Sequence, residues 1–182
     1  MGASILNNGF SASYLGGDGK RLFATDHPLV SGGTNSNRPA TYVDLSETAL
    51  ENAVIQIAGW TDQRGLLIAT KAKQLVVPMA LSFTADKILN TVLKTDSADN
   101  TINSIYHTGS IPKGYHVNNY LTDPDAWFVT TDAPDGFKYF DRVPMSFSKD
   151  GDFDTGNLRW KARARWSFGF TNPLAAYGSE GI

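Results

Sequence analysis

Hydrophobic residues after Ser46 recur at the three- and four-residue spacing of an amphipathic helix. The apolar side of this segment is formed by aliphatic residues, namely Leu50, Ala53, Val54, Ile57 and Ala58. Ser46, or Asp44 together with Glu47, can accept hydrogen bonds from the free amides of the first turn, and Gly59 lies near the end of the pattern. The spacing therefore predicts a helix from Ser46 to the region of Gly59.

Two short apolar segments follow, at residues 66–70 and 74–77, and Pro78 ends the second. Their length and the turn residues beside them are typical of buried strands. Pro78 suits the first turn of a second helix, which is predicted to run to about Lys94. The apolar face of this second helix is expected to contain Ala80, Phe83, Ile88 and Val92. Residues 46–94 are thus predicted to form helix, strand, strand and helix.

The flanking segments alternate between loop and strand composition. Residues 11–41 are rich in Gly, Ser, Thr and Asn, which favour turns, and predict a long loop. The segment from Thr95 to Asn103 has a similar polar composition and is expected to form a mobile surface loop. Residues 115–121 and 126–131 have the β-branched and aromatic content of two strands, separated by a turn.

The clearest alternation lies in the last third of the chain. Apolar residues share one parity in most of the segment 137–148, and every even position from 158 to 170 is apolar. Such alternation predicts two strands, joined by the turn-forming residues between them. The odd positions of the second strand carry a basic stripe, which consists of Arg159, Lys161, Arg163 and Arg165. Alternation places all four cations on one face of the strand.

The basic stripe needs opposite charges nearby, and several partners are conceivable. Acids of adjacent strands or plain solvation would make the stripe structural, whereas acids of a neighbouring subunit or a polyanion would make it functional. The candidate acids within the chain are Asp141, Asp150, Asp152 and Asp154, most of which lie in the connecting turn. We therefore expect at least two of the four cations to contact something outside the subunit. The aromatic residues of the same strand are expected in a sheet core rather than in a ligand platform; they are Trp160, Trp166, Phe168 and Phe170.

Composition places the chain among globular proteins. It has 182 residues, of which 41% are hydrophobic and 19% charged, and a formal net charge of −2. This balance fits one ordinary domain or two small ones. No apolar run approaches the roughly 20 residues needed to span a bilayer. The absence of cysteine excludes a disulfide framework, a thiolate metal site and a cysteine nucleophile.

No sequence pattern indicates catalysis or metal binding. The three histidines, His27, His107 and His116, lack the spacing of a helical zinc site. Residues 150–157 superficially suggest a calcium loop, but the glycine at its sixth position and the glutamate at its twelfth are missing. Glycine-rich segments lack the remaining residues of phosphate-binding motifs, and no Gly-x-Ser-x-Gly sequence occurs. The sequence therefore predicts no enzyme activity, no cofactor and no metal site.

Several short segments follow one another in a characteristic order along nearly the whole chain. They are Phe10 after an Asn-Asn-Gly turn, residues 19–28, the helix at 45–60, residues 62–65 and 74–78, Tyr120-Leu121-Thr122-Asp123 with Trp127-Phe128, and a closing strand at 163–169 with Asn172-Pro173. Together these segments resemble the major capsid protein of tailed bacteriophages. Because each motif is short, the resemblance rests on their order and spacing.

The resemblance implies an α+β shell-forming fold. On this mapping residues 1–41 would be a connecting loop with a remnant of the spine and peripheral region, residues 42–135 the axial domain, and residues 136–182 the returning peripheral-domain strands and the C-terminus. Family members begin with an N-terminal arm, an extended loop and a spine helix. The chain is therefore expected to be a C-terminal portion truncated at the N-terminus, with the extended loop and spine helix absent, unless the numbering omits an upstream region.

The resemblance also implies a function. The chain would be a structural head subunit that self-assembles through pentamers and hexamers into an icosahedral shell around phage double-stranded DNA. Its partners would be further copies of itself, scaffolding, portal or decoration proteins, and DNA bound nonspecifically on the inner surface, but no membrane. It would reside in the virion after assembly in the host cytoplasm. The resemblance assigns no catalytic, cofactor-binding or cross-linking residue.

Two other functions remain open at this stage. An encapsulin-like nanocompartment protein would share the fold and differ by an internal cargo-binding groove, for which no motif is visible. A small hydrolase or carbohydrate-binding α+β domain would use the aromatic strands and the acidic turn. Formation of particles separates the two shell proteins from the third function.

Overall fold

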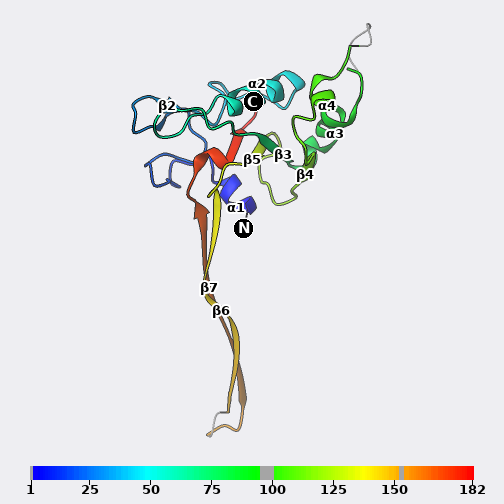
Figure 1. Cartoon of the computed structure of the whole chain (residues 1–182). Coiled ribbons are helices and arrows are strands. Elements are labelled where there is room, and N and C mark those ends of the chain that lie inside the picture. The colour runs from blue at the N-terminus through cyan, green and yellow to red at the C-terminus, as the bar shows by residue number, and fades with distance from the viewer. Residues whose placement is uncertain (1, 95–100, 152–153) are drawn as a thin grey trace.

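A sheet with helices on its sides forms the body of the molecule, and a long hairpin projects from it (Figure 1). The computed structural model describes residues 2–94, 101–151 and 154–182. Within these ranges the helices are α1 (Gly2–Asn7), α2 (Glu47–Ala58), α3 (Ser82–Asn90) and α4 (Ser104–Thr108), with 3-10 turns at Met79–Leu81 and Pro173–Ala175. The strands are β1 (His27–Pro28), β2 (Thr34–Asn35), β3 (Ala72–Val77), β4 (Tyr115–Val117), β5 (Trp127–Thr131), β6 (Phe137–Gly151), β7 (Leu158–Phe170) and β8 (Ala176–Ser179).

The central sheet of the described chain has four strands in the order β4-β3-β5-β8. β3 is parallel to β4 and antiparallel to β5, and β5 is antiparallel to β8. The predicted strands at 115–121 and 126–131 are confirmed as the shorter β4 and β5. They do not pair with each other, because β3 lies between them. The mixture of helices, one mixed sheet and an antiparallel hairpin confirms the predicted α+β class.

The helix predicted after Ser46 is confirmed as α2. The Ser46 side chain accepts a hydrogen bond from the Ala49 amide at 3.1 Å, which satisfies one free donor of the first turn. The helix ends at Ala58, and Gly59 is its C-cap. Its buried residues are Ala49, Leu50, Ala53 and Ile57, so the predicted face is confirmed except at Ala58, which is exposed.

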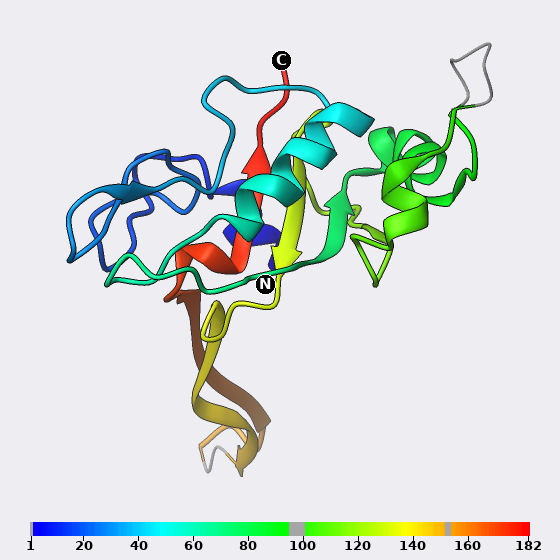
Figure 2. The same cartoon turned by 45° about the horizontal axis from the view of Figure 1, so that its top comes forward.

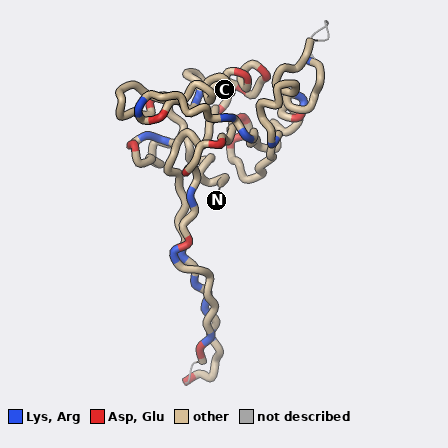
Figure 3. Tube along the Cα trace, in the orientation of Figure 1, with Lys and Arg blue, Asp and Glu red and all other residues tan. Residues whose placement is uncertain are grey.

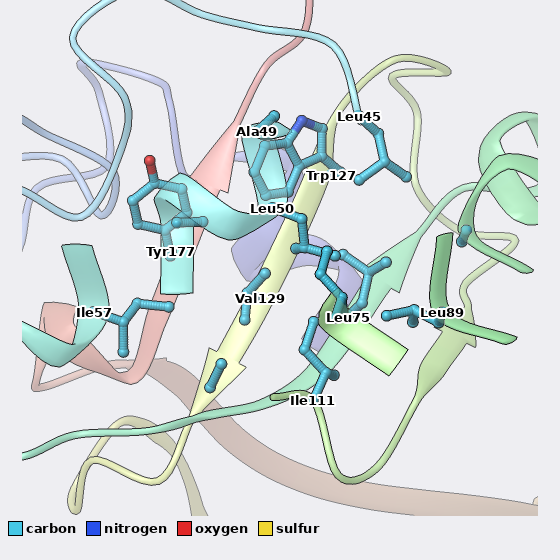
Figure 4. Packing of buried hydrophobic residues seen from close by; sticks show 14 of the residues in the cluster. Leu45, Ala49, Leu50, Ile57, Leu75, Leu89, Ile111, Trp127, Val129 and Tyr177 are labelled. Carbon is cyan, nitrogen blue, oxygen red and sulfur yellow. The ribbon is translucent and has the colours of Figure 1, made fainter. Parts of the chain in front are cut away.

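Alternation along β5 divides the core into two layers. Trp127 and Val129 point toward α2, which lies across one face of the sheet (Figures 2 and 4). Phe128 points to the other face, where its ring centroid lies 5.9 Å from that of Phe10 and 5.4 Å from that of Phe23. Both faces of β5 are therefore covered, as expected for a strand with a continuous apolar sequence.

The strand predicted at 66–70 is wrong. The segment folds back on residues 60–62, since the Asp62 amide donates to the Leu66 carbonyl at 2.8 Å and the Ile68 amide donates to the Trp60 carbonyl at 3.2 Å. Leu66 and Leu67 are exposed. A short apolar run between turn residues does not by itself specify a buried strand, and here the run forms an exposed turn instead.

The helix predicted from Pro78 to Lys94 is shorter than expected, and it buries a different face. It consists of the 3-10 turn and α3, which buries Ala85 and Leu89, whereas Phe83 and Val92 are exposed. The buried Asn103 side chain donates to the carbonyl oxygens of Ile88 and Thr91 at 2.7 and 3.0 Å, at the end of α3. These bonds satisfy carbonyls that a longer helix would have used.

The same Asn103 corrects part of the predicted mobile loop at 95–103. Its side-chain oxygen accepts from the amides of Ile105 and Tyr106 and so caps α4. Asn103 therefore joins two helices and belongs to the ordered core. Residues 95–100, the larger part of that prediction, lie outside the described residues.

Asn37 organises the segment predicted as a long loop, which is confirmed apart from the short β1-β2 pair. Its side chain is fully buried, accepts a hydrogen bond from the Ala24 amide at 2.9 Å and donates to the Leu22 carbonyl at 2.7 Å. It also donates to the carbonyls of Pro173 and Ala176, so the loop is attached to the C-terminal strand.

Within the described residues no helix is both long enough and apolar enough to cross a membrane.

The hairpin leaves and rejoins the body at one point, because β5 pairs with β8 directly beside it. Thr130 lies opposite Ala176, and the Thr131 hydroxyl donates to the Leu174 carbonyl at 2.6 Å. The Thr171 amide donates to the Gly136 carbonyl at 2.9 Å. We call residues 132–136 and 171–175 the root. A Cβ atom added at Gly136 would lie 2.2 Å from the Ala175 Cβ, so the two root segments touch at a position that only glycine fits.

The first prediction concerns this contact at the root. Gly136→Ala is expected to lower the free energy of unfolding by about 1–3 kcal/mol, because overpacking forces one segment away from the other. Urea unfolding measures the loss. Gly169→Ala is the matched control, since a Cβ at Gly169 meets no atom within 4 Å. Equal unfolding midpoints for the two variants would contradict the close contact.

The second prediction concerns Tyr177, whose ring packs 6.0 Å from Trp127 between centroids. Burial raises the pKa of Tyr177 to about 12. An exposed tyrosine in the unfolded chain titrates near 10, so the unfolded state loses its proton first. The contribution of Tyr177 to stability is therefore complete below about pH 10 and is lost as the pH rises toward 12.

Urea unfolding between pH 8 and 12 tests this dependence. Tyr177→Phe is expected to flatten the fall above pH 10, at the cost of the hydrogen bond that Tyr177 donates to Gln56. Tyr120→Phe is the control, because Tyr120 is exposed. If both variants keep the wild-type slope, the phenol is not protected by the fold.

Candidate assembly interface

β6 and β7 form a two-stranded antiparallel ribbon that extends away from the body (Figure 1). We call residues 137–170 the arm. The two strands predicted from alternation are thereby confirmed, and they pair from Phe137–Phe170 at the root to Gly151–Leu158 near the tip. Within the described residues neither strand has a further neighbour in its sheet. Both edges of the ribbon are therefore unpaired within the described residues.

The strand register gives the arm a basic face. Residues directly opposite each other in an antiparallel pair point to the same side. On this side each of the four predicted cations lies opposite one residue of β6: Arg159 faces Asp150, Lys161 faces Ser148, Arg163 faces Ser146 and Arg165 faces Val143. All four are exposed. The structure thus places them together, as alternation predicted.

Only some of the acidic residues that were expected to pair with the basic stripe lie on this face. Asp150 lies opposite Arg159, but Asp141 lies opposite Trp166 and so points to the other side. Asp152 lies outside the described residues. Among the side chains that the structure describes, Lys161, Arg163 and Arg165 take part in no ion pair. Three adjacent cations therefore lack a partner from the described chain.

The opposite side of the arm is an aromatic face. Its exposed members come from both strands and are Phe137, Tyr139, Phe147, Trp160, Trp166 and Phe168. The expectation that Trp160, Trp166 and Phe168 lie in a sheet core is wrong, since no other layer of the described chain covers them. Phe170, at the root, does pack against the second core layer. Alternation identifies residues that share a face, but it does not show what covers that face.

Two bulges interrupt β6 at the middle of the arm. The register shifts between Asp141 and Val143 and again between Val143 and Ser146. Each shift adds one residue to β6, so Val143 moves to the basic face while Tyr139 and Phe147 remain on the aromatic face. Pro144 lies inside the second bulge, where a residue without an amide hydrogen costs no ladder bond. The bulges therefore preserve the two faces along the full arm.

Charge is divided unequally between arm and body. The sequence places seven Lys or Arg and four Asp in residues 137–170, a net charge of +3, and leaves −5 for the rest of the chain. Figure 3 shows basic residues along the arm and most acidic residues in the body. The arm and the body of two separate copies are thus electrostatically complementary.

A cavity of about 670 Å³ opens beside the root. Its walls come from the loop around Asp18 and His27, the turn at 61–63, and root residues 132–134 and 171–174. Within the described ranges, no group of three His, Asp or Glu side chains is arranged to hold a metal ion. His107 and His116 lie on other elements, in α4 and β4.

The histidine in this cavity has the environment of a structural group. His27 is buried, and its Nδ1 lies 2.6 Å from Asp18 Oδ2. Its Nε2 lies 3.2 Å from both the Leu22 carbonyl oxygen and Asn37 Oδ1. In a hydrolytic triad the second ring nitrogen would face a nucleophilic hydroxyl, but here it faces two acceptors of the core. The pair joins loop segments and offers no support for the hydrolase alternative.

Comparison with known proteins gives the chain a family. A family model for phage capsid protein matches residues 3–179. Among solved structures, the chain is similar to a virus-like particle from Pyrococcus furiosus, with 13% identity, a TM-score of 0.45, and coverage of 76% of this chain and 55% of that one. It is also similar to a chain from Mycobacterium phage Che8, with 16% identity, a TM-score of 0.42, and coverage of 79% and 53%. The chain spans about half the length of these two.

No curated protein sequence matches the chain. The family match, in contrast, includes both core layers, the root, the whole arm and all of β8. It confirms the resemblance that the order of sequence segments indicated. The chain belongs to the phage capsid protein family.

Proposed function

We propose that the chain is the major head subunit of a tailed phage, a structural protein that self-assembles into an icosahedral shell around double-stranded DNA. The observation that carries this proposal is the family match over residues 3–179, which includes the whole two-stranded arm. A shell subunit needs complementary surfaces rather than a reactive site. An arm of net charge +3 on a body of −5 supplies such surfaces.

The mapping of the sequence onto an axial domain at 42–135, a peripheral part at 136–182 and a connecting part at 1–41 belongs to the same proposal. So do pentamers and hexamers as building blocks, scaffolding, portal or decoration proteins as partners, and DNA bound nonspecifically on the inner surface. The protein would be assembled in the host cytoplasm and remain in the virion.

We further infer that at least two of the cations Arg159, Lys161, Arg163 and Arg165 pair with acids of a neighbouring copy. Unit charges about 7 Å apart near a surface repel by about 2 kcal/mol before salt screening, at an effective dielectric constant of about 20. The described chain provides an opposite acid only for Arg159. A neighbouring body of net charge −5 favours pairing between subunits over contact with DNA.

Electron microscopy of the purified chain, combined with nuclease protection, tests the proposed function. Closed shells with icosahedral symmetry from the purified chain, and double-stranded DNA protected from nuclease in shells isolated from infected cells, are the expected results. Closed shells that protect a protein cargo and no DNA would favour the encapsulin-like alternative. A chain that stays monomeric and binds a sugar or turns over an ester would contradict a shell function.

The third prediction concerns the charge of the basic face. Arg163→Gln combined with Arg165→Gln is expected to weaken subunit association by about fivefold, which corresponds to about 1 kcal/mol for two exposed ion pairs. The loss should be larger at low salt, where charges are less screened. Light scattering measures the assembly yield, and the melting temperature of the free subunit should stay nearly unchanged.

Lys87→Gln combined with Lys113→Gln is the matched control, because both lysines are exposed on the body and the charge change is the same. If the arm variant melts earlier while its folded fraction assembles normally, the basic face is paired within the subunit. That result would contradict pairing between copies.

A further inference from the structure

Both ring nitrogens of the buried His27 face hydrogen-bond acceptors. Its Nδ1 lies 2.6 Å from Asp18 Oδ2, and its Nε2 lies 3.2 Å from both the Leu22 carbonyl oxygen and Asn37 Oδ1. A neutral imidazole has one N–H donor and one acceptor nitrogen. It can therefore satisfy the acceptors on one side of the ring, but not those on both sides.

The orientation of the Asn37 amide is set by groups other than His27. Its oxygen accepts a hydrogen bond from the Ala24 amide at 2.9 Å. Its nitrogen donates at 2.7 to 3.2 Å to three main-chain carbonyl oxygens, those of Leu22, Pro173 and Ala176. Rotating the amide by half a turn would break all four of these bonds. Asn37 Oδ1 is therefore an acceptor, and the Nε2 atom that faces it carries a hydrogen.

The other side of the ring needs a second proton. Two lone pairs 2.6 Å apart repel each other, so a hydrogen lies between Nδ1 and the carboxyl group of Asp18. Asp18 Oδ1 accepts a hydrogen bond from the Lys20 amide at 3.1 Å, which favours the carboxylate over the protonated acid. The proton therefore resides on the histidine, and the pair is an imidazolium beside a carboxylate.

The charged groups around the pair favour this extra proton. Besides the pair, the charged side chains in the described wall of the cavity are Asp62 and Asp132, both acids. The hydrogen bond from the Leu66 amide holds the pKa of Asp62 below its usual range, so Asp62 remains an anion. The neighbouring charges of the loop are engaged elsewhere, with Lys20 on Asp26 and Arg21 on the Phe10 carbonyl.

The pair holds a loop that reaches the base of the arm. The loop at residues 16–20 is closed by the Gly16 amide, which donates to the Lys20 carbonyl at 2.7 Å. A Cβ atom added at Gly16 would lie 2.6 Å from Cε2 of Phe170, so the loop touches the last residue of the arm. Gly17 and Asp18 form part of the cavity wall. The bond from Asp18 to His27 thus ties this loop to β1.

We propose that the contact between Asp18 and His27 is a proton-dependent attachment, which holds the loop at residues 16–20 against Phe170 and releases it when the pH rises. Once the second proton leaves, the carboxylate faces a lone pair, and the Asp18 side chain, which is 23% exposed, turns to water. The Nε2 contacts with the core need only the first proton and remain. The attachment is therefore present at lower pH and lost at higher pH.

The contact lies within one subunit, so it goes beyond the proposed shell function and does not depend on it. NMR of the unassembled subunit with nitrogen-15 in its histidines tests the proton directly. At about pH 6 both ring nitrogens of His27 are expected to show a directly bonded hydrogen, and at about pH 9 only Nε2. The nuclear Overhauser effect between Gly16 and the Phe170 ring reports the attachment of the loop. It is expected to weaken about tenfold over the same range, as one hydrogen bond to a charged group is lost.

A pair of variants separates the proton from other effects of pH. Asp18→Asn places an amide donor beside Nδ1, which a neutral ring accepts without a second proton. This variant is expected to keep the contact between Gly16 and Phe170 at both pH values. Asp26→Asn is the matched control, because Asp26 is the residue next to His27 but its carboxylate is bound by Lys20. It should lose the contact at high pH as the wild type does.

Each measurement can overturn the proposal by itself. A single hydrogen on the His27 ring at about pH 6 would show that the second proton is absent. A contact between Gly16 and Phe170 that is equally strong at both pH values in the wild type would show that the proton does not hold the loop. An Asp18→Asn variant that loses this contact with rising pH would assign the pH dependence to another group. None of these results would affect the proposed shell function.

Discussion

The pairing of β5 with β8 is the constraint on which the rest of the molecule depends. It places Thr130 opposite Ala176, so the chain between these two residues leaves the sheet and returns to the same point. An antiparallel ribbon meets this condition. The close contact between Gly136 and Ala175 holds its two segments together at the root. A ribbon of two strands has no layer on either side. The geometry of the core thus places a long two-stranded ribbon outside the four-stranded sheet.

Two bulges and an unequal charge distribution give this ribbon one aromatic face and one basic face. The bulges around Val143 and Pro144 cancel each other, so aromatic residues stay on one side from root to tip. Cations occupy the other side, above a body that is acidic overall. Attraction between unlike charges acts over about 10 Å, whereas apolar burial acts only at contact. The basic face therefore suits the approach of a second, acidic subunit that the proposed function requires, within a family whose members are capsid proteins.

Local periodicity accounts for what the sequence predicted correctly. Helix α2 and the arm strands repeat their pattern within a few residues, and Ser46 marks a helix start by chemistry that needs no distant partner. The failures share a different cause. The run at 66–70 and the tryptophans of β7 are apolar, but burial depends on which segment lies above them. Asn37, Asn103 and the His27-Asp18 pair were missed because a single polar residue in a loop carries no period that would reveal its buried partners.

The position of the arm in an assembled particle distinguishes pairing of the basic face between copies from pairing within one subunit. A cryo-EM reconstruction of particles grown from the purified chain would resolve residues 137–170 and their surroundings. We predict that at least two of the cations Arg159, Lys161, Arg163 and Arg165 lie within about 4 Å of acidic side chains of a second copy. Particles in which the arm extends freely into solvent, or contacts only its own body, would contradict it.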